Sequence, residues 1–118
     1  MINVGCVLYK KGNEAGTLDA KWCHPYFGEG VFGTGKATGG PVEGYEGLYQ
    51  IQYFDAEGNP IAGFELSIEK EGDYYSLAWI DNGEILDRGI GMEVSDGLVA
   101  GWRRISDTPP QDFETQEN

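Results

Sequence analysis

The chain has 118 residues, which is enough for one domain with a modest core. Its formal net charge of −12 argues against binding to nucleic acid or to an anionic membrane surface, because both need clustered lysine and arginine. The two longest segments without glycine or proline, Leu48–Glu57 and Asp73–Asn82, leave no room for an ordinary helix of about 11 residues, so the sequence indicates an all-β protein.

The N-terminal segment and the two cysteines indicate in which cellular compartment the protein is expected. Residues 1–11 are too short and too soon interrupted by polar residues for a signal peptide or a membrane span, so we expect a cytoplasmic protein. Cys6 and Cys23 agree with a reducing compartment. They fall on neighbouring expected strands and could approach each other diagonally, but we favour two reduced residues of the core or surface.

Alternation of apolar and polar residues predicts five strands in the first part of the chain. They cover Ile2–Lys10, Thr17–His24, Val31–Thr38, Tyr45–Phe54 and Ile61–Glu69. Loops rich in glycine, proline and polar residues separate them, as expected for hairpin connections.

For two of these strands the sequence does not decide which face points inward. In the first, the inward set is either Val4, Cys6 and Leu8 or Val7 and Tyr9. In the third, Phe32 inside would turn Lys36 inward, whereas small residues inside would leave Lys36 in solvent. An unpaired buried lysine costs several kcal/mol, so we expect Lys36 to lie outside.

Three more strands are expected to form a meander between Tyr74 and Ile105. It is entered through a tight turn at Glu71-Gly72, which sets Leu66 opposite Leu77. The meander completes a barrel domain over residues 1–106. Residues 107–118 are acidic, contain two adjacent prolines and have one aromatic residue, so they are expected to form a disordered tail.

The turns of the meander fix its expected register. Asn82-Gly83 predicts a type I′ hairpin, and pairing across it sets Leu77 opposite Arg88. The loop Ser95–Gly97 fits a three-residue turn with a left-handed glycine, which sets Arg88 opposite Arg104. This register keeps the apolar residues on one face and turns Arg88 into the interior.

Eight short antiparallel strands close naturally into an up-and-down barrel without exposed edges. Over Ile2–Ile105 the chain resembles the calycins, the group of avidin-like and lipocalin-like barrels. The segments that carry the resemblance are Gly44–Ile51, Tyr75–Trp79, Gly89–Met92 and Gly97–Arg103. For many calycins the resemblance implies a ligand bound inside the barrel.

The expected topology gathers polar and aromatic residues at one end. The residues expected toward this end are His24, Tyr53, Trp79, Arg88 and Arg104, with Trp22 and Trp102 in nearby layers. Two arginines among indoles can bind a carboxylate or a phosphate. They can equally close the barrel as a plug, each guanidinium stacked on an indole. The calycin resemblance favours the plug.

The other end carries the glycine-rich loops and is the usual mouth in barrels of this shape. Tyr49 lies near it and could contact a small apolar or aromatic ligand. No metal or cofactor is expected, because one histidine and two thiols on adjacent strands do not make a zinc set. His24 could ligate haem or pair with Cys23, but a solvated histidine before Pro25 is the better interpretation.

These features predict a non-catalytic binding or regulatory barrel for a small hydrophobic or acidic ligand. An enzyme of cyclase or isomerase type, with one polar group acting as acid or base in the pocket, is one alternative. A structural protein with a filled interior is the other. In that case a homodimer could form through an outer strand face, where the expected apolar residues are Leu48, Phe54, Ile80 and Ile85.

Overall fold

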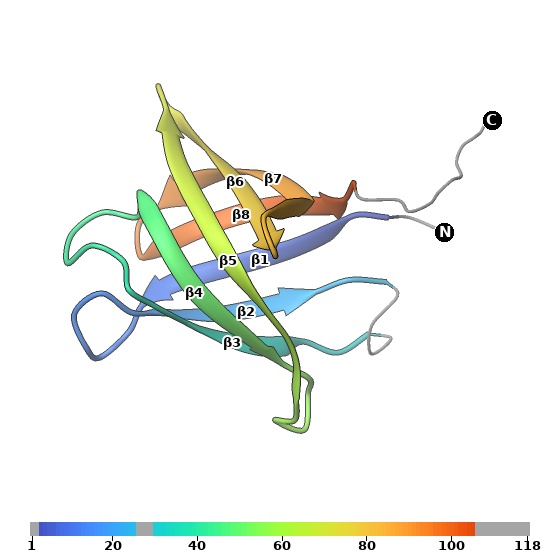
Figure 1. Cartoon of the computed structure of the whole chain (residues 1–118). Helices are drawn as coiled ribbons and strands as arrows, with labels where there is room; N and C mark the ends of the chain where they lie inside the picture. The colour runs from blue at the N-terminus through green and yellow to red at the C-terminus, as the bar shows by residue number, and fades with distance from the viewer. Residues whose placement is uncertain (1–2, 26–29, 106–118) are drawn as a thin grey trace.

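A computed structural model describes residues 3–25 and 30–105, which form a closed barrel of eight antiparallel strands (Figure 1). Each strand pairs with the next along the chain and β8 pairs with β1, which confirms the predicted meander barrel. The described residues contain no helix that is long and apolar enough to cross a membrane. The strands are β1 (Gly5–Lys11), β2 (Leu18–Cys23), β3 (Gly33–Thr38), β4 (Gly47–Phe54), β5 (Pro60–Glu71), β6 (Tyr74–Asp81), β7 (Glu84–Val94) and β8 (Gly97–Arg104).

The two open questions of strand orientation are settled by burial. Val7 and Tyr9 of β1 face the core, and Cys6 lies exposed on the outer surface. In β3 the small residues face inward, and Lys36 projects outward as predicted, with its Nζ 3.1 Å from Asp19 Oδ1. The expected acidic tail at residues 107–118 lies outside the described residues.

The turn between β5 and β6 differs from the expected one. Glu71 pairs with Tyr74, so the turn residues are Gly72, with φ +66°, and Asp73. Leu66 therefore lies opposite Trp79 rather than Leu77. The shift is two residues, and a shift of an even number leaves every side chain on its expected face. For this reason the core composition of both strands was still predicted correctly.

A β-bulge between β6 and β7 overturns the prediction for Arg88. Asn82 and Gly83 have φ values of 51° and 81°, as the type I′ turn requires. The register then shifts, so that Trp79 pairs with Asp87 and Leu86 is the additional residue. Because one extra residue reverses the faces beyond it, Arg88 lies exposed on the outside and Asp87 is buried inside. The same reversal exposes Ile90 and Met92, so the expectation that all apolar residues of the meander share the inner face is wrong.

The hairpin between β7 and β8 is also tighter than predicted. Val94 pairs with Gly97, so only Ser95 and Asp96 lie in the turn and the expected three-residue loop is wrong. Gly97 does not have a positive φ. A Cβ at this position would lie 2.6 Å from the Tyr9 carbonyl oxygen, so glycine is needed for close packing against β1. The tighter turn places Asp87, and not Arg88, opposite Arg104.

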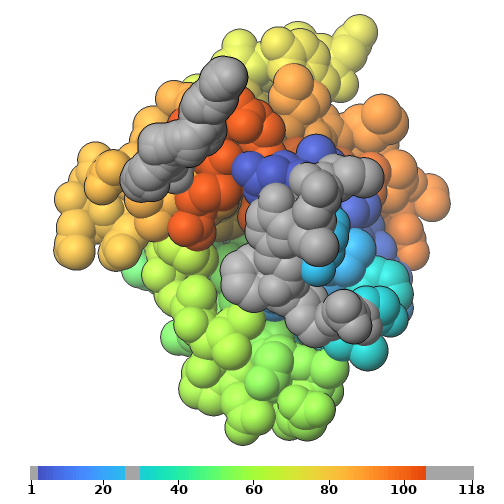
Figure 2. Space-filling view, turned by 90° about the vertical axis from the view of Figure 1, so that its right-hand side faces the viewer, coloured from blue at the N-terminus to red at the C-terminus, as the bar shows by residue number. Residues whose placement is uncertain are grey.

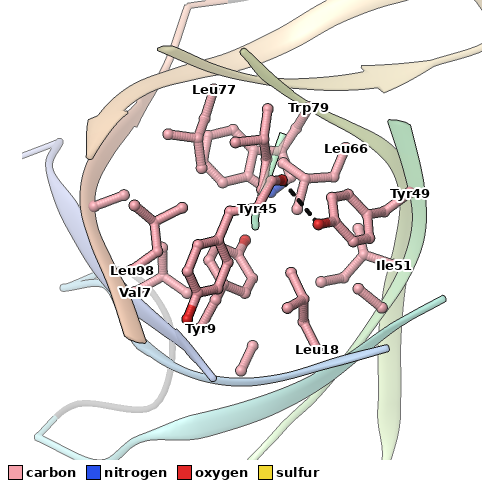
Figure 3. Packing of buried hydrophobic residues seen from close by; sticks show 14 of the residues in the cluster. Val7, Tyr9, Leu18, Tyr45, Tyr49, Ile51, Leu66, Leu77, Trp79 and Leu98 are labelled. Atoms are coloured by element: carbon pink, nitrogen blue, oxygen red, sulfur yellow. Dashed lines mark hydrogen bonds between the residues drawn. The ribbon is translucent and has the colours of Figure 1, made fainter. Parts of the chain in front are cut away.

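The core fills the barrel from all sides of its wall (Figure 3). Its fully buried side chains include two tyrosines, Tyr9 and Tyr49, among leucines, isoleucine and valine. On the outer face, Leu48 is exposed, whereas Phe54, Ile80 and Ile85 are half-buried. Buried side chains therefore fill most of the interior of the described barrel, and a cavity remains at one end.

Candidate functional site

The end that carries the β1–β2 and β3–β4 loops is closed by tyrosines. Tyr45 lies across this end and packs edge-to-face on Tyr75, with ring centroids 6.4 Å apart. Tyr49 is buried beneath it and donates its hydroxyl to the Tyr45 carbonyl oxygen at 2.8 Å (Figure 3). Lys11 Nζ donates to the carbonyl oxygens of Pro41 and Gly44, which ties the β3–β4 loop down. The expected mouth is therefore closed.

Three buried polar groups cross the middle of the barrel. The Tyr9 and Tyr53 hydroxyl oxygens lie 2.7 Å apart, and Trp79 Nε1 donates to the Tyr53 hydroxyl at 2.7 Å. Burial raises the pKa of Tyr53, and burial with the neighbouring Tyr53 raises the pKa of Tyr9 well above its usual value. These phenols stay neutral at physiological pH and form a hydrogen-bonded floor.

Above this floor, at the opposite end from Tyr45, the barrel holds a cavity of about 290 Å³. Figure 2 views the molecule from this end, where the β4–β5 hairpin projects at the bottom of the view. The cavity wall is mostly aromatic and aliphatic, with one acidic and one basic residue. The lining residues are Val7, Trp22, Tyr53, Ile61, Ala62, Phe64, Trp79, Asp87, Trp102 and Arg104.

Glycines on neighbouring strands make room for the indoles of this wall. A Cβ at Gly33 would lie 2.6 Å from the Trp22 ring, and a Cβ at Gly5 would overlap the Trp102 ring. Each indole therefore approaches the bare backbone of its glycine more closely than any larger residue there would allow. The Trp22 indole is fixed further because its Nε1 donates to the Thr34 carbonyl oxygen at 2.9 Å. This arrangement keeps large rings in the wall and leaves the centre open.

Asp87 and Arg104 form the polar part of the cavity. Arg104 Nε donates to Asp87 Oδ1 at 2.9 Å, and Arg104 Nη2 donates to Asp87 Oδ2 at 3.3 Å. The Asp87 side chain is 4% exposed, whereas the Arg104 side chain is 48% exposed. A guanidinium has five N–H donors, so this contact fixes its orientation and leaves donors for another acceptor.

His24 lies beside this pair and is buried, so the expected solvated histidine is wrong. Its ring stacks on Trp102 with centroids 4.8 Å apart, and its Nε2 lies 3.2 Å from Asn3 Oδ1. Burial lowers the pKa of His24 below 6.5; the Asp87 carboxylate acts in the opposite direction, and the Arg104 guanidinium lowers it further. The imidazole is therefore neutral at physiological pH and extends the aromatic rim of the cavity.

The structure brings together four of the six residues that the sequence suggested as ligand contacts. Tyr53, Trp79, Trp102 and Arg104 line the cavity. Tyr49 lies in the closed end instead, and the expected inward position of Arg88 is wrong. In place of the two inward arginines that were expected, the structure has Arg104 paired with Asp87.

Sequence reasoning missed Asp87 as a site residue. Asp87 and Arg88 are adjacent, so either could face inward, and only the position of the bulge decides which one does. The signal that favoured Asp87 was energetic, since an inward aspartate opposite Arg104 is neutralised and an inward Arg88 would place two cations side by side.

Among the described residues, no group of three or more histidine, cysteine, aspartate or glutamate side chains could hold a metal ion. Comparison with known proteins finds no family model, no curated protein and no solved structure that matches the chain.

Proposed function

We propose that the chain is a non-catalytic binding barrel whose cavity takes one small aromatic molecule that bears an acidic group. The observation that carries the proposal is a cavity of about 290 Å³ with an indole-rich wall and a half-exposed arginine at its rim. The arrangement of strands also supports a calycin-like classification, since eight consecutive antiparallel strands close around a cavity that lies at one end.

The volume of the cavity limits the size of the ligand. An apolar cavity of about 150 Å³ is enough to bind benzene, so this one has room for roughly two fused rings. An eight-stranded barrel is expected to hold at most one small ligand in addition to its own side chains. The closed packing around Tyr9 and Tyr49 excludes a longer molecule from reaching the other end.

The polar residues favour an acid over a base. Arg104 uses Nε and one Nη2 donor for Asp87, so its remaining N–H groups are available to a carboxylate. Asp87 keeps the guanidinium in place before a ligand arrives, which reduces the entropy lost on binding. The ion pair with Arg104 engages both oxygens of Asp87, which favours a positioning role for this carboxylate.

Calorimetric titration with 1-naphthoate and with its neutral analogue 1-naphthalenemethanol tests the proposal. We expect both to bind, the acid more tightly. The variant Arg104→Gln should weaken binding of the acid about tenfold and leave the alcohol unchanged, which corresponds to about 1.4 kcal/mol. The matched control is Arg103→Gln, because Arg103 is the adjacent residue and lies on the outer face opposite Arg88.

If neither compound binds at millimolar concentration, the cavity does not take small aromatic molecules. If Arg104→Gln and Arg103→Gln weaken the acid by the same factor, the effect comes from net charge and not from a contact in the cavity.

A further inference from the structure

Cys6 and Cys23 are directly opposite each other on β1 and β2. They form the last residue pair of this ladder, and both are free thiols. The adjoining pair, Val7 with Trp22, faces the interior, so the two cysteine side chains share the outer face. Cys6 is exposed and Cys23 is partly exposed, which leaves the pair accessible to small thiol reagents.

The distances expected for such a pair are close to those of a disulfide. Directly opposed residues in an antiparallel ladder have Cα atoms about 4.5–5.5 Å apart, within the range of about 4.4–6.8 Å found in disulfides. Their Cβ atoms are about 4.5–5.5 Å apart, and a disulfide needs roughly 3.5–4.5 Å. Bond formation therefore requires the strands to approach by no more than about 1 Å.

The positions of the two residues allow this approach. β2 ends at Cys23, and Cys6 is the second residue of β1, so both lie at strand ends. On the other side of Cys6 its partner in β8 is Gly101, which has no side chain to block a reagent. The remaining mismatch predicts a strained bond, and strained disulfides are the more easily reduced ones.

We propose that Cys6 and Cys23 form a reversible disulfide on the outer surface, made by exchange with a low-molecular-weight disulfide. The more exposed Cys6 thiolate attacks one sulfur of that disulfide and releases the first small thiolate, giving a mixed disulfide. The Cys23 thiolate then attacks Cys6 Sγ, forms the Sγ–Sγ bond and releases the second. The two protons lost by the cysteines end on the two small thiols, and the two electrons reduce the external disulfide.

The bond would form directly behind the wall of the cavity. Val7 and Trp22, the next residue pair along the same two strands, both line it. Drawing β1 and β2 together at Cys6 and Cys23 therefore displaces the Trp22 indole, whose Nε1 donates to Thr34. The indole N–H signal of Trp22 in a proton–nitrogen correlation spectrum reports this movement without any ligand.

The test equilibrates the whole chain with oxidised glutathione, alkylates the remaining thiols and measures the intact mass. The expected product has lost two hydrogen atoms, carries no glutathione and no alkyl group, and reverts with dithiothreitol. Cys23→Ala should stop at the mixed disulfide on Cys6. Cys6→Ala should react more slowly, because Cys23 is less exposed. Circular dichroism verifies that both variants fold, as expected for substitutions on the outer face.

A geometric control moves the second thiol without changing the number of cysteines. The double variant Lys21→Cys, Cys23→Ala places it opposite Leu8, diagonal to Cys6, where ring closure should be at least tenfold slower. Wild-type protein that keeps two separate glutathione adducts, or that crosslinks only between chains, would overturn the proposal. A disulfide that leaves the Trp22 signal unmoved would overturn its effect on the cavity wall and nothing else.

Discussion

The two ends of the barrel are both built from aromatic side chains, yet one is packed and the other is hollow. At the closed end, Tyr45 and Tyr49 point across the barrel, and the Tyr49 hydroxyl finds a carbonyl oxygen in the loop above it. At the open end, Trp22 and Trp102 pack against the bare backbone of Gly33 and Gly5 and line a cavity. Aromatic content alone therefore does not decide whether an end of the barrel is filled.

Loop anchoring accompanies this difference. The β3–β4 loop is held over the closed end by Lys11 and by the Gly40 N–H, which donates to the Gly16 carbonyl oxygen at 3.0 Å. A Cβ at Gly40 would overlap the Tyr49 ring, so the loop backbone packs directly on the core. At the open end the corresponding layer is the half-exposed Arg104 over buried Asp87. One end is sealed by loop backbone, whereas the other has a half-exposed charged side chain at the rim of its cavity.

The largest expected effect is alkaline unfolding through the buried phenols. Burial raises the pKa of Tyr49 to about 12, and Tyr9 and Tyr53 are raised as well. Below pH 10 the folded and unfolded chains both keep these protons, so the free energy of unfolding stays level. Above pH 10 the unfolded chain releases protons that the folded chain retains, and stability falls by about 1.4 kcal/mol per pH unit for each such phenol.

Urea unfolding from pH 8 to pH 12, with phenolate absorbance at each pH, measures this effect. Tyr74→Phe is the control, because Tyr74 is exposed and its removal should leave the profile unchanged. A free energy of unfolding that stays level up to pH 12 would show that the buried phenols ionise without opening the barrel.

The next effect compares truncation at the two ends. Tyr49→Ala should destabilise the protein by about 3–5 kcal/mol, because it opens a void in a closely packed layer and strands a carbonyl oxygen. Trp102→Ala should cost less, about 1–3 kcal/mol, since this indole is partly exposed and borders an existing cavity. Denaturant midpoints give both values. Equal losses would mean that the open end is as closely packed as the other.

The smallest expected change in stability comes from substitutions of Asp87 and Arg88, two adjacent residues whose faces depend on the bulge. Asp87→Ala removes the buried acceptor of Arg104 and should cost about 1–3 kcal/mol. Arg88→Ala changes an exposed side chain and should stay within about 0.5 kcal/mol of the original stability. Thermal melts of the pair measure the difference. If Arg88→Ala is the more damaging substitution, the register without the bulge is correct and Arg88 lies inside.

The barrel itself could be predicted from the sequence because its determinants are local. Period-two alternation marks which residues of Tyr49–Tyr53 and Leu66–Ile68 face inward, and the Asn82-Gly83 turn requires the positive φ values that the structure has. The two-residue error in the predicted register of β5 and β6 did not change which side chains face inward, because an even shift leaves each side chain on the same face of the sheet. Aromatic residues of the cavity, such as Trp79 and Trp102, were predicted by the same alternation.

Only the tertiary structure decided which charge lies inside and which end is open. The bulge at Leu86 exchanges Asp87 for Arg88, and alternation within one strand carries no information about an extra residue on that strand. The partner strand favours the bulge, because Asp87 pairs with Arg104 on the neighbouring strand β8. Without the bulge, an inward Arg88 would lie beside the cation of Arg104. Likewise, Trp22 and Tyr49 are both inward by pattern. What surrounds each ring comes from other segments: Gly33 leaves room for the Trp22 indole, and the Tyr45 carbonyl oxygen accepts the Tyr49 hydroxyl.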